Sequence, residues 1–222
     1  YAVPSTRKSD LFSLGEGWTI AGIPVAEVIN ANEMYVYLNG EGTYKVGTDG
    51  YLEGRGAKDL RFSTNAGYSY DGVTSSYALS NVTGTVWYFN NTGKPIACKG
   101  KHNQYIRFKY TSAGKMDRIT DTVGRVIKFT YNGSNVLVDV YESSSSSVSL
   151  QSWRYELQPT GVTGKSNLVK VHQPTGQTVT FGYSPYSTNY SVYYNGLAYN
   201  TNLACFNLTS VKHTTEATTN YT

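Results

Sequence analysis

The chain has 222 residues and a mass of 24.4 kDa, which suits one large β domain or two small ones. Its formal net charge is +4, and the Lys and Arg residues are scattered along the chain, so the composition does not indicate a nucleic-acid partner. Apolar residues make up 39% of the chain without any run of about 18 of them, which excludes a membrane-spanning helix.

Tyrosine is unusually abundant, with 21 residues of this type. A tyrosine ring packs well on a sheet while its hydroxyl stays hydrated, so a sheet with one wet face accommodates it easily. No long segment has the 3.6-residue apolar period of an amphipathic helix. The sequence therefore predicts an all-β fold, which we expect to be a curved antiparallel sheet of repeated β-hairpins.

The chain begins with Tyr1 rather than Met and carries no signal peptide, so we expect it to be a piece of a longer protein. Low charge combined with abundant Ser, Thr, Asn and Tyr is typical of exported bacterial proteins and predicts a secreted, cell-surface or cell-wall location. Cys98 and Cys205 are interpreted as free thiols, with one long-range bridge as the alternative, because a β domain of this size does not need disulfides.

Residues 1–84 are predicted to form a lead-in β region. Its strongest signal is Asn39-Gly40 between two alternating apolar runs, a pattern typical of a β-hairpin. Residues 61–84 are rich in Ser, Gly and Tyr and predict a loop with one strand. The expected strand segments of the lead-in region are 34–38, 43–46, 51–54, 60–62 and 76–79.

Residues 85–222 are predicted to form β-hairpin repeats. Each unit ends in an aromatic residue, and successive units are 22, 21, 24 and 28 residues long by subtraction of the positions Tyr88, Tyr110, Tyr131, Tyr155 and Tyr183. A period in this range indicates an architecture built from one repeated supersecondary unit.

The unit 110–131 is the most regular. Gly114 and Gly124 mark two turns, because glycine reaches positive φ without steric cost. The segments 115–121 and 126–131 alternate like strands and are rich in β-branched and aromatic residues. The residues expected to pack in this unit are Tyr110, Ile119, Phe129 and Tyr131.

The neighbouring units are less regular. The serine run 143–147 is predicted to be an elongated hairpin loop, since serine does not form a core. A strand at 208–212 is expected to start another repeat. The other segments assigned to the repeats are 88–94, 106–110, 136–140, 153–155 and 168–183.

The combination of Gly114-Lys115, Ile119-Thr-Asp121, Gly124-Arg125 and Phe129-Thr-Tyr131 resembles a tyrosine-aspartate (YD) repeat of the Rhs superfamily. The segments 14–18 and 86–94 are similar to the region before the first repeats in bacterial wall-associated Rhs-type proteins. The Asp of the repeat's name is absent, since Phe, Thr and Asn follow the first three unit-ending tyrosines. The residues that define the repeat pattern are Tyr88, Gly93, Tyr110, Gly114, Asp121, Gly124, Arg125, Phe129 and Tyr131.

This resemblance implies a part of a spiral shell that, in the parent protein, encapsulates a C-terminal toxin and helps to deliver it. The implied partners are the remainder of the shell and the enclosed C-terminal domain. Such shells commonly end in a segment rich in Asp-Pro-x-Gly that assists self-cleavage, and this chain contains no Asp-Pro. We therefore expect a non-enzymatic structural fragment that lacks the protease segment and the toxin and needs no cofactor.

Residues for enzymatic chemistry are present but not in catalytic patterns. None of His102, His172 and His213 lies in a nucleophile-elbow motif, and no Gly-x-Ser-x-Gly occurs. Asp117 and Asp121 would lie about 13 Å apart along a strand, beyond the roughly 9.5 Å of an inverting glycosidase. Asp121 is instead interpreted as a turn residue, and a hydrolase is the least supported function.

A metal site built from Cys98, His102, Cys205 and His213 is also disfavoured. The first Cys and His have a ligand-like spacing, but the second pair is too widely separated for a typical zinc knuckle. The sequence therefore predicts no metal site.

The tyrosine-rich segment 183–199 suggests an alternative function. Exposed aromatic rings can stack on sugars, and the family has been linked to carbohydrate binding. Cross-strand packing is the favoured interpretation of these rings, because sheets use aromatic pairs routinely. The alternative is a cell-surface carbohydrate-binding or adhesion module that uses Tyr186, Tyr190, Tyr193 and Tyr194.

Overall fold

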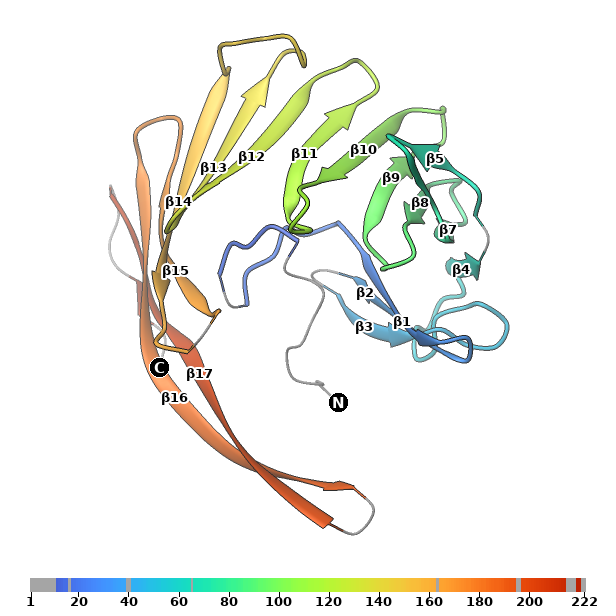
Figure 1. Ribbon diagram of the computed structural model, residues 1–222. Coiled ribbons are helices and arrows are strands. Elements are labelled where there is room, and N and C mark those ends of the chain that lie inside the picture. Colours follow the sequence, from blue (N-terminus) through green and yellow to red (C-terminus); the bar gives the residue numbers. More distant parts are fainter. Residues whose placement is uncertain are drawn as a thin grey trace. The chain divides into compact units, whose positions relative to one another are not determined.

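The computed structural model describes residues 11–15, 17–38, 41–64, 66–162, 164–194, 197–214 and 219–220, with the backbone alone along 186–194, 197–205 and at 220. Across these residues the regular structure is antiparallel β-strand, with no helix, which confirms the predicted all-β hairpin fold (Figure 1). The chain divides into two compact units, formed mainly by 18–130 and by 152–222. The predicted division at residue 84 stays a prediction.

A small antiparallel sheet opens the first unit. It contains β1 (Val25–Asn30), β2 (Glu33–Leu38) and β3 (Gly42–Lys45) in that order. The β2–β3 pairing confirms the hairpin predicted for 34–46, although its Asn39-Gly40 turn lies outside the described residues. β1 was not predicted, because its adjacent residues Val25 and Ala26 are both buried and so break the alternating pattern of a half-exposed strand.

The large sheet is a meander in which each strand from β7 onward pairs with the next one in the chain. In the first unit its order is β4-β7-β8-β9-β10-β11-β12, and in the second it is β14-β15-β16-β17-β18, with β13 between β12 and β14 in the strand order. The strands are β4 (Leu60–Thr64), β7 (Tyr77–Asn81), β8 (Val86–Phe89), β9 (Pro95–Lys99), β10 (Tyr105–Tyr110), β11 (Met116–Asp121), β12 (Val126–Asn132), β13 (Asn135–Tyr141), β14 (Gln151–Pro159), β15 (Ser166–His172), β16 (Thr178–Tyr194), β17 (Leu197–His213) and β18 (Thr219–Asn220).

Most reversals of this meander use the same five-residue turn. In turn 90–94, for example, the Asn90 N–H donates to the Lys94 carbonyl at 2.9 Å, and the Gly93 N–H donates to the Asn90 carbonyl at 3.0 Å. The fourth residue is left-handed, with φ of 79° at Gly93, as expected for a type I turn followed by a bulge. The same two bonds and a left-handed fourth residue recur in the meander at turns 81–85, 100–104, 111–115, 121–125 and 173–177, and also in turn 47–51 outside the large sheet.

The first residue of these turns often accepts hydrogen bonds through its side chain. The Asp121 carboxylate accepts from the backbone N–H groups of Val123 at 3.1 Å and Arg125 at 2.9 Å. The amide oxygens of Asn81 and Asn90 accept equivalent bonds in their own turns. Asp121 therefore lies in a turn as expected, and a short polar side chain at this position specifies the reversal locally.

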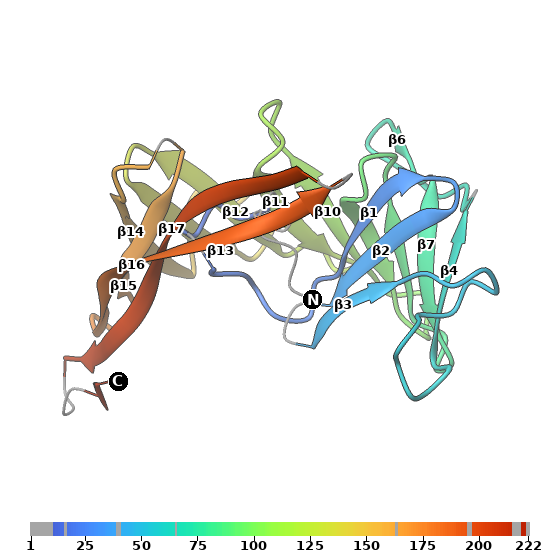
Figure 2. The ribbon, with the colours of Figure 1, turned by 90° about the horizontal axis from the view of Figure 1, so that it is seen from below.

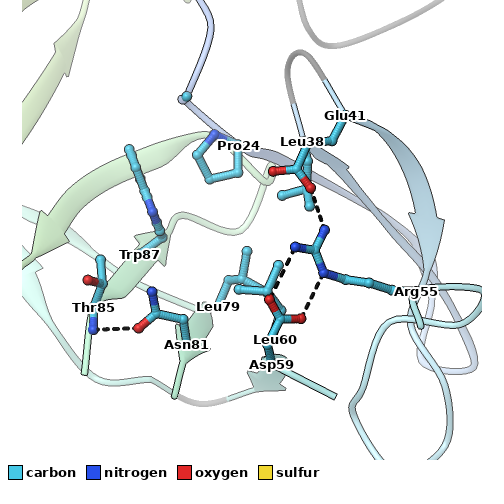
Figure 3. A pocket seen from close by; sticks show the side chains of 11 residues that line it. Pro24, Leu38, Glu41, Arg55, Asp59, Leu60, Leu79, Asn81, Thr85 and Trp87 are labelled. Carbon is cyan, nitrogen blue, oxygen red and sulfur yellow. Dashed lines mark hydrogen bonds and ion pairs between the residues drawn. The ribbon is translucent and has the colours of Figure 1, made fainter. Parts of the chain in front are cut away.

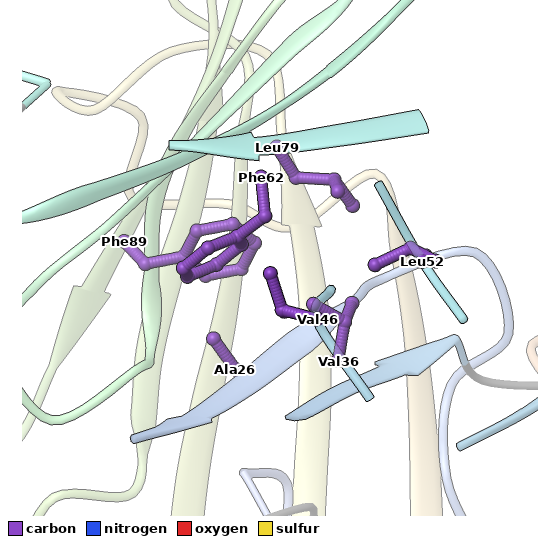
Figure 4. Packing of buried hydrophobic residues seen from close by; sticks show 7 residues of the cluster. All are labelled: Ala26, Val36, Val46, Leu52, Phe62, Leu79 and Phe89. Atoms are coloured by element: carbon purple, nitrogen blue, oxygen red, sulfur yellow. The ribbon is translucent and has the colours of Figure 1, made fainter. Parts of the chain in front are cut away.

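The core of the first unit lies between the small sheet and the start of the large one. Ala26, Val36, Val46 and Leu52 contribute from the small sheet and its exit, and they meet aromatic and aliphatic side chains of β4, β7 and β8 (Figure 4). The ribbon in Figure 2 shows the small sheet in front of β4 and β7. Burial of a large apolar side chain stabilises a fold by about 1.5–3 kcal/mol, so this cluster joins the two sheets firmly. The large-sheet members of the cluster are Phe62, Leu79 and Phe89.

The segment Leu11–Phe12 packs on the same sheet further along. The Met116 N–H donates to the Leu11 carbonyl at 2.7 Å, and the rings of Phe12 and Phe129 lie 5.4 Å apart between centroids. Leu11 and Phe12 are each 1% exposed, and Phe129 is buried as its assignment as a packing residue requires.

The turns 90–94 and 111–115 are covered by other parts of the first unit. The Ala26 N–H donates to the Gly93 carbonyl at 2.9 Å, so β1 lies directly against the first of these turns. The Lys94 ammonium donates to the Gly114 carbonyl and lies 5.3 Å from the centre of the Tyr110 ring. By contrast, a Cβ placed on Gly84 or Gly124 would meet no other atom within 4 Å, so their turns are open.

Two of the unit-ending tyrosines have equivalent roles. The Tyr110 hydroxyl donates to the Pro95 carbonyl at 2.6 Å, and the Tyr183 hydroxyl donates to the Leu168 carbonyl at 2.7 Å. Burial raises the pKa of Tyr110 well above its usual value. Tyr88 differs, because it stacks on Tyr68 from another part of the chain.

The connection between β4 and β7 folds over one face of the sheet. It contains the short hairpin of β5 (Ser69–Tyr70) and β6 (Val73–Thr74). The Tyr68 ring stacks on Tyr88 at 4.6 Å and on Tyr105 at 5.4 Å, from β8 and β10 respectively. The strand between them, β9, carries the small and fully buried Ala97, which pairs with Tyr88 in register. A small residue there leaves room for the Tyr68 ring.

The second unit contains a longer hairpin than expected. β16 and β17 each have 17 residues and pair from Val179–His213 to Tyr194–Leu197. The last unit-ending residue was expected at Tyr183 and a separate strand was expected at 208–212 to start another repeat, whereas 208–212 belongs to the end of β17. Serine, threonine and asparagine between the tyrosines obscure the apolar pattern of a strand. The serine run 143–147 lies between β13 and β14, as predicted.

The covered and open turns predict different costs of a single methyl group. Gly124→Ala should reduce the free energy of unfolding by about 1–2 kcal/mol, because a left-handed residue with a Cβ is strained. Gly93→Ala should cost several kcal/mol more, because its Cβ would also overlap the Ala26 carbonyl and displace β1. Urea unfolding of both variants measures the difference, and equal losses would show that β1 is not held against this turn.

Candidate functional site

The tyrosines proposed for sugar binding all lie on β16. In register, Tyr186 pairs with Cys205, Tyr190 with Thr201, and Tyr194 with Leu197. Tyr193 pairs with Ala198, and the side chains of all these residues lie outside the described part of the structure. Their role in carbohydrate binding stays a prediction.

The candidate metal ligands occupy separate elements. Cys98 lies on β9 and His102 in the turn 100–104, whereas Cys205 and His213 lie on β17. Among the residues that the structure describes, no group of three or more His, Cys, Asp or Glu side chains is placed to hold a metal ion. Cys98 is a half-buried free thiol whose pKa burial raises to about 11, which keeps it protonated at neutral pH.

Unit-ending residues and turn residues do not converge on one site. Asp121 and Arg125 form an ion pair of 2.6 Å within their turn, and Arg125 is largely exposed. Phe129 is buried, and Tyr110 bonds to the backbone of β9. These residues hold the sheet together and do not line the pocket described next.

A pocket of about 260 Å³ lies beside the core cluster of the first unit (Figure 3). β4, β7 and β8 supply one part of its wall, and the segment leading into β1, the end of β2 and the loop after β3 supply the rest. Its lining residues are Gly22, Pro24, Leu38, Glu41, Arg55, Asp59, Leu60, Leu79, Asn81, Thr85 and Trp87.

Arg55 is the charged centre of the pocket. Its Nε donates to Asp59 Oδ1 at 2.8 Å, one terminal nitrogen donates to Asp59 Oδ2 at 3.1 Å, and the other donates to Glu41 Oε2. These bonds, first those to Asp59 and then that to Glu41, raise the pKa of Arg55, and Arg55 in turn lowers the pKa of Asp59. Three N–H directions of the guanidinium are therefore engaged by carboxylates.

Trp87 forms the aromatic wall. One face of its indole stacks on Phe108 with ring centroids 5.8 Å apart. Phe108 belongs to β10, on the far side of β9, so the opposite indole face is turned toward β7 and the pocket. Figure 3 shows this ring across the cavity from Arg55, with Leu79 and Leu60 between them.

The polar groups near Trp87 are largely occupied by local structure. Asn81 Oδ1 accepts from the N–H groups of Thr83 and Thr85 and from the Thr83 hydroxyl. The pocket thus combines apolar walls, an aromatic face and a charged cluster whose members mainly bind one another.

This pocket was not predicted from the sequence. Glu41 directly precedes β3, Arg55 and Asp59 lie in the segment between β3 and β4, and no motif links them to Trp87. The available local signal is the Arg55-Gly-Ala-Lys-Asp59 spacing, which resembles many solvated charge pairs. Only the packing of the small sheet against β4, β7 and β8 brings the four side chains together.

Neither a scan against models of known protein families nor a comparison with curated proteins finds a match to this chain. The YD-repeat resemblance therefore remains a prediction from the residues themselves. Within the part of the chain that the structure describes, no helix has the length and apolar character needed to cross a membrane.

The Arg55 cluster predicts a measurable contribution to stability. Arg55→Met removes three charge-assisted hydrogen bonds from a side chain that is 21% exposed and leaves two carboxylates close together, so we expect a loss of about 1–2 kcal/mol in urea unfolding. Lys58→Met is the matched control, since it removes a cation paired with Asp49 at an exposed position and should have a smaller effect. Equal losses in the two variants would contradict this role of Arg55.

Proposed function

We propose that this chain is a non-enzymatic structural segment of a larger β-hairpin wall. The observation that supports this most directly is the repeated five-residue turn, which joins successive strands from β7 to β12 with the same hydrogen bonds. A chain built in this way extends by adding one hairpin to the preceding strand. Side chains at the covered end of the sheet bind neighbouring backbone carbonyls, as Lys94 in turn 90–94 and Tyr110 at the end of β10 illustrate.

The second unit offers an edge for such an extension. β17 pairs with β16 along its length, but within the described residues its other side pairs with β18 only at Ser210 and Val211. Most of a 17-residue strand therefore presents unpaired backbone groups, which readily accept another strand. A further hairpin of the parent protein is the proposed occupant of this edge.

The resemblance to YD repeats extends the proposal to the whole parent protein. In this proposal the wall closes into a shell around a C-terminal toxin, keeps it inert and helps to deliver it from a secreted or cell-wall-associated protein. The sequence of the gene beyond Thr222 tests the cargo directly. Further hairpin repeats followed by an Asp-Pro-x-Gly segment would support it, and an anchoring motif or a stop codon directly after Thr222 would contradict it.

The open edge predicts that the isolated chain self-associates. Sedimentation velocity should give a weight-average mass that rises with protein concentration, because edge strands of different molecules pair. Single proline substitutions at two adjacent positions of β17 test whether its open edge is used, since neighbouring residues of an antiparallel strand direct their N–H groups to opposite sides. Of Asn202→Pro and Leu203→Pro, one should abolish association and keep the hairpin, and the other should disrupt the β16–β17 pairing. If the unsubstituted 222-residue chain is strictly monomeric, this part of the proposal is overturned.

The alternative function is carbohydrate binding or adhesion at a cell surface. It is supported by the concentration of tyrosines along β16. Tyr193→Ala and Tyr194→Ala should each weaken binding on a glycan array, because one stacking surface is lost. Tyr51→Ala, which alters a tyrosine of the first unit beside Lys58, is the control. An array without any bound glycan would eliminate this alternative.

A further inference from the structure

We propose that the pocket between Arg55 and Trp87 binds a small organic cation, an ammonium group carried on a short apolar stem. This function is independent of the structural role of the sheet, because the pocket lies beside the core cluster of the first unit and does not involve the β17 edge.

The charged side chains of the pocket favour a cation. The pocket contains two carboxylates, Glu41 and Asp59, and one guanidinium, so these three side chains have a formal sum of −1. Arg55 donates three of its five N–H groups to these carboxylates, whose combined charge exceeds its own. An anionic ligand would therefore be repelled, whereas a cation would complement the excess negative charge.

The hydrogen bonds of the two carboxylates indicate where the cation would bind. Asp59 uses both oxygens on Arg55, whereas Glu41 binds Arg55 through Oε2. Oε1 of Glu41 is thus the carboxylate oxygen best able to face a ligand. The Glu41 side chain is also 56% exposed, so it can adjust to a ligand without disturbing the core.

The indole of Trp87 offers an aromatic face to such a cation. An ammonium ion is attracted to the electron-rich face of an aromatic ring, and indole is the strongest of the natural side chains in this respect. Trp87 is fixed by its stacking on Phe108 and turns its other face to the cavity. Leu38, Leu60 and Leu79 complete an apolar lining that suits an alkyl stem.

Size and hydrogen bonding argue against a sugar in this pocket. A volume of about 260 Å³ lies at the lower limit of small-molecule sites, which are usually larger than roughly 300 Å³. Sugar recognition needs several free donors and acceptors, but Asp59 and Arg55 bind one another and Asn81 Oδ1 holds its own turn. The Asn81 side-chain NH2 group and the Thr85 hydroxyl also belong to the lining, but negative charge and an aromatic face are its distinguishing features for a ligand.

The test is a titration of the whole chain with choline and with its neutral isostere 3,3-dimethyl-1-butanol, followed by Trp fluorescence and by chemical-shift changes of the indole N–H signals. Both probes have the same shape, so only the charge differs. We expect choline to bind at least about tenfold more tightly than the alcohol, and its affinity to fall with added salt. Equal affinities, or no binding of choline, would overturn the proposal.

Two substitutions assign the site. Glu41→Gln removes one negative charge at nearly constant shape and should weaken choline binding severalfold, whereas Asp49→Asn makes the same change outside the pocket and should leave it unaltered. Both residues are largely exposed, so neither variant should unfold the chain. Unchanged binding in Glu41→Gln would overturn the assignment, as would binding of N-acetylglucosamine in place of choline. Association of the chain by sedimentation is measured separately and is not expected to change.

Discussion

The fold depends on a backbone conformation that most amino acids avoid. Each five-residue turn of the meander needs a left-handed residue at its fourth position, and glycine occupies it in turns 81–85, 90–94, 111–115 and 121–125. Turn 100–104 has Asn103 there instead, the residue type that tolerates this region best after glycine. With the reversals fixed locally, strands β7 to β12 can pair with their sequence neighbours and need no long-range crossover.

A repeated turn does not make the two ends of the strands equivalent. Successive reversals alternate between the ends, and the first unit covers one end with β1 and with the Lys94 side chain, while Gly84 and Gly124 face open space at the other. The pocket is a further product of this packing, because it forms where the small sheet meets β4, β7 and β8.

Local signals were sufficient to predict the hairpins of the regular unit and failed where partners decide the structure. Gly114, Asp121 and Gly124 specify turns by themselves, and the strands around them have alternating patterns. β1 was missed because both Val25 and Ala26 are buried, and the length of β16 was missed because its partner β17 extends a weakly patterned segment. Arg55, Glu41 and Trp87 come together only through tertiary packing, so no sequence spacing could have indicated their pocket.

Lys94 gives the covered end of the sheet an unusual independence from acid. Its partners are the Gly114 carbonyl and the Tyr110 ring, neither of which gains a proton as the pH falls, and no carboxylate occurs in turns 90–94 and 111–115. Turn 121–125 differs: although desolvation acts in the opposite direction, hydrogen bonds from Arg125 lower the pKa of Asp121 below its usual 3.8. The stability that Asp121 contributes is fully present above its usual pKa of 3.8 and is lost as the pH falls through the lowered pKa of the folded protein. Acidification in this range therefore weakens turn 121–125, while the bond from Lys94 to the Gly114 carbonyl is unaffected.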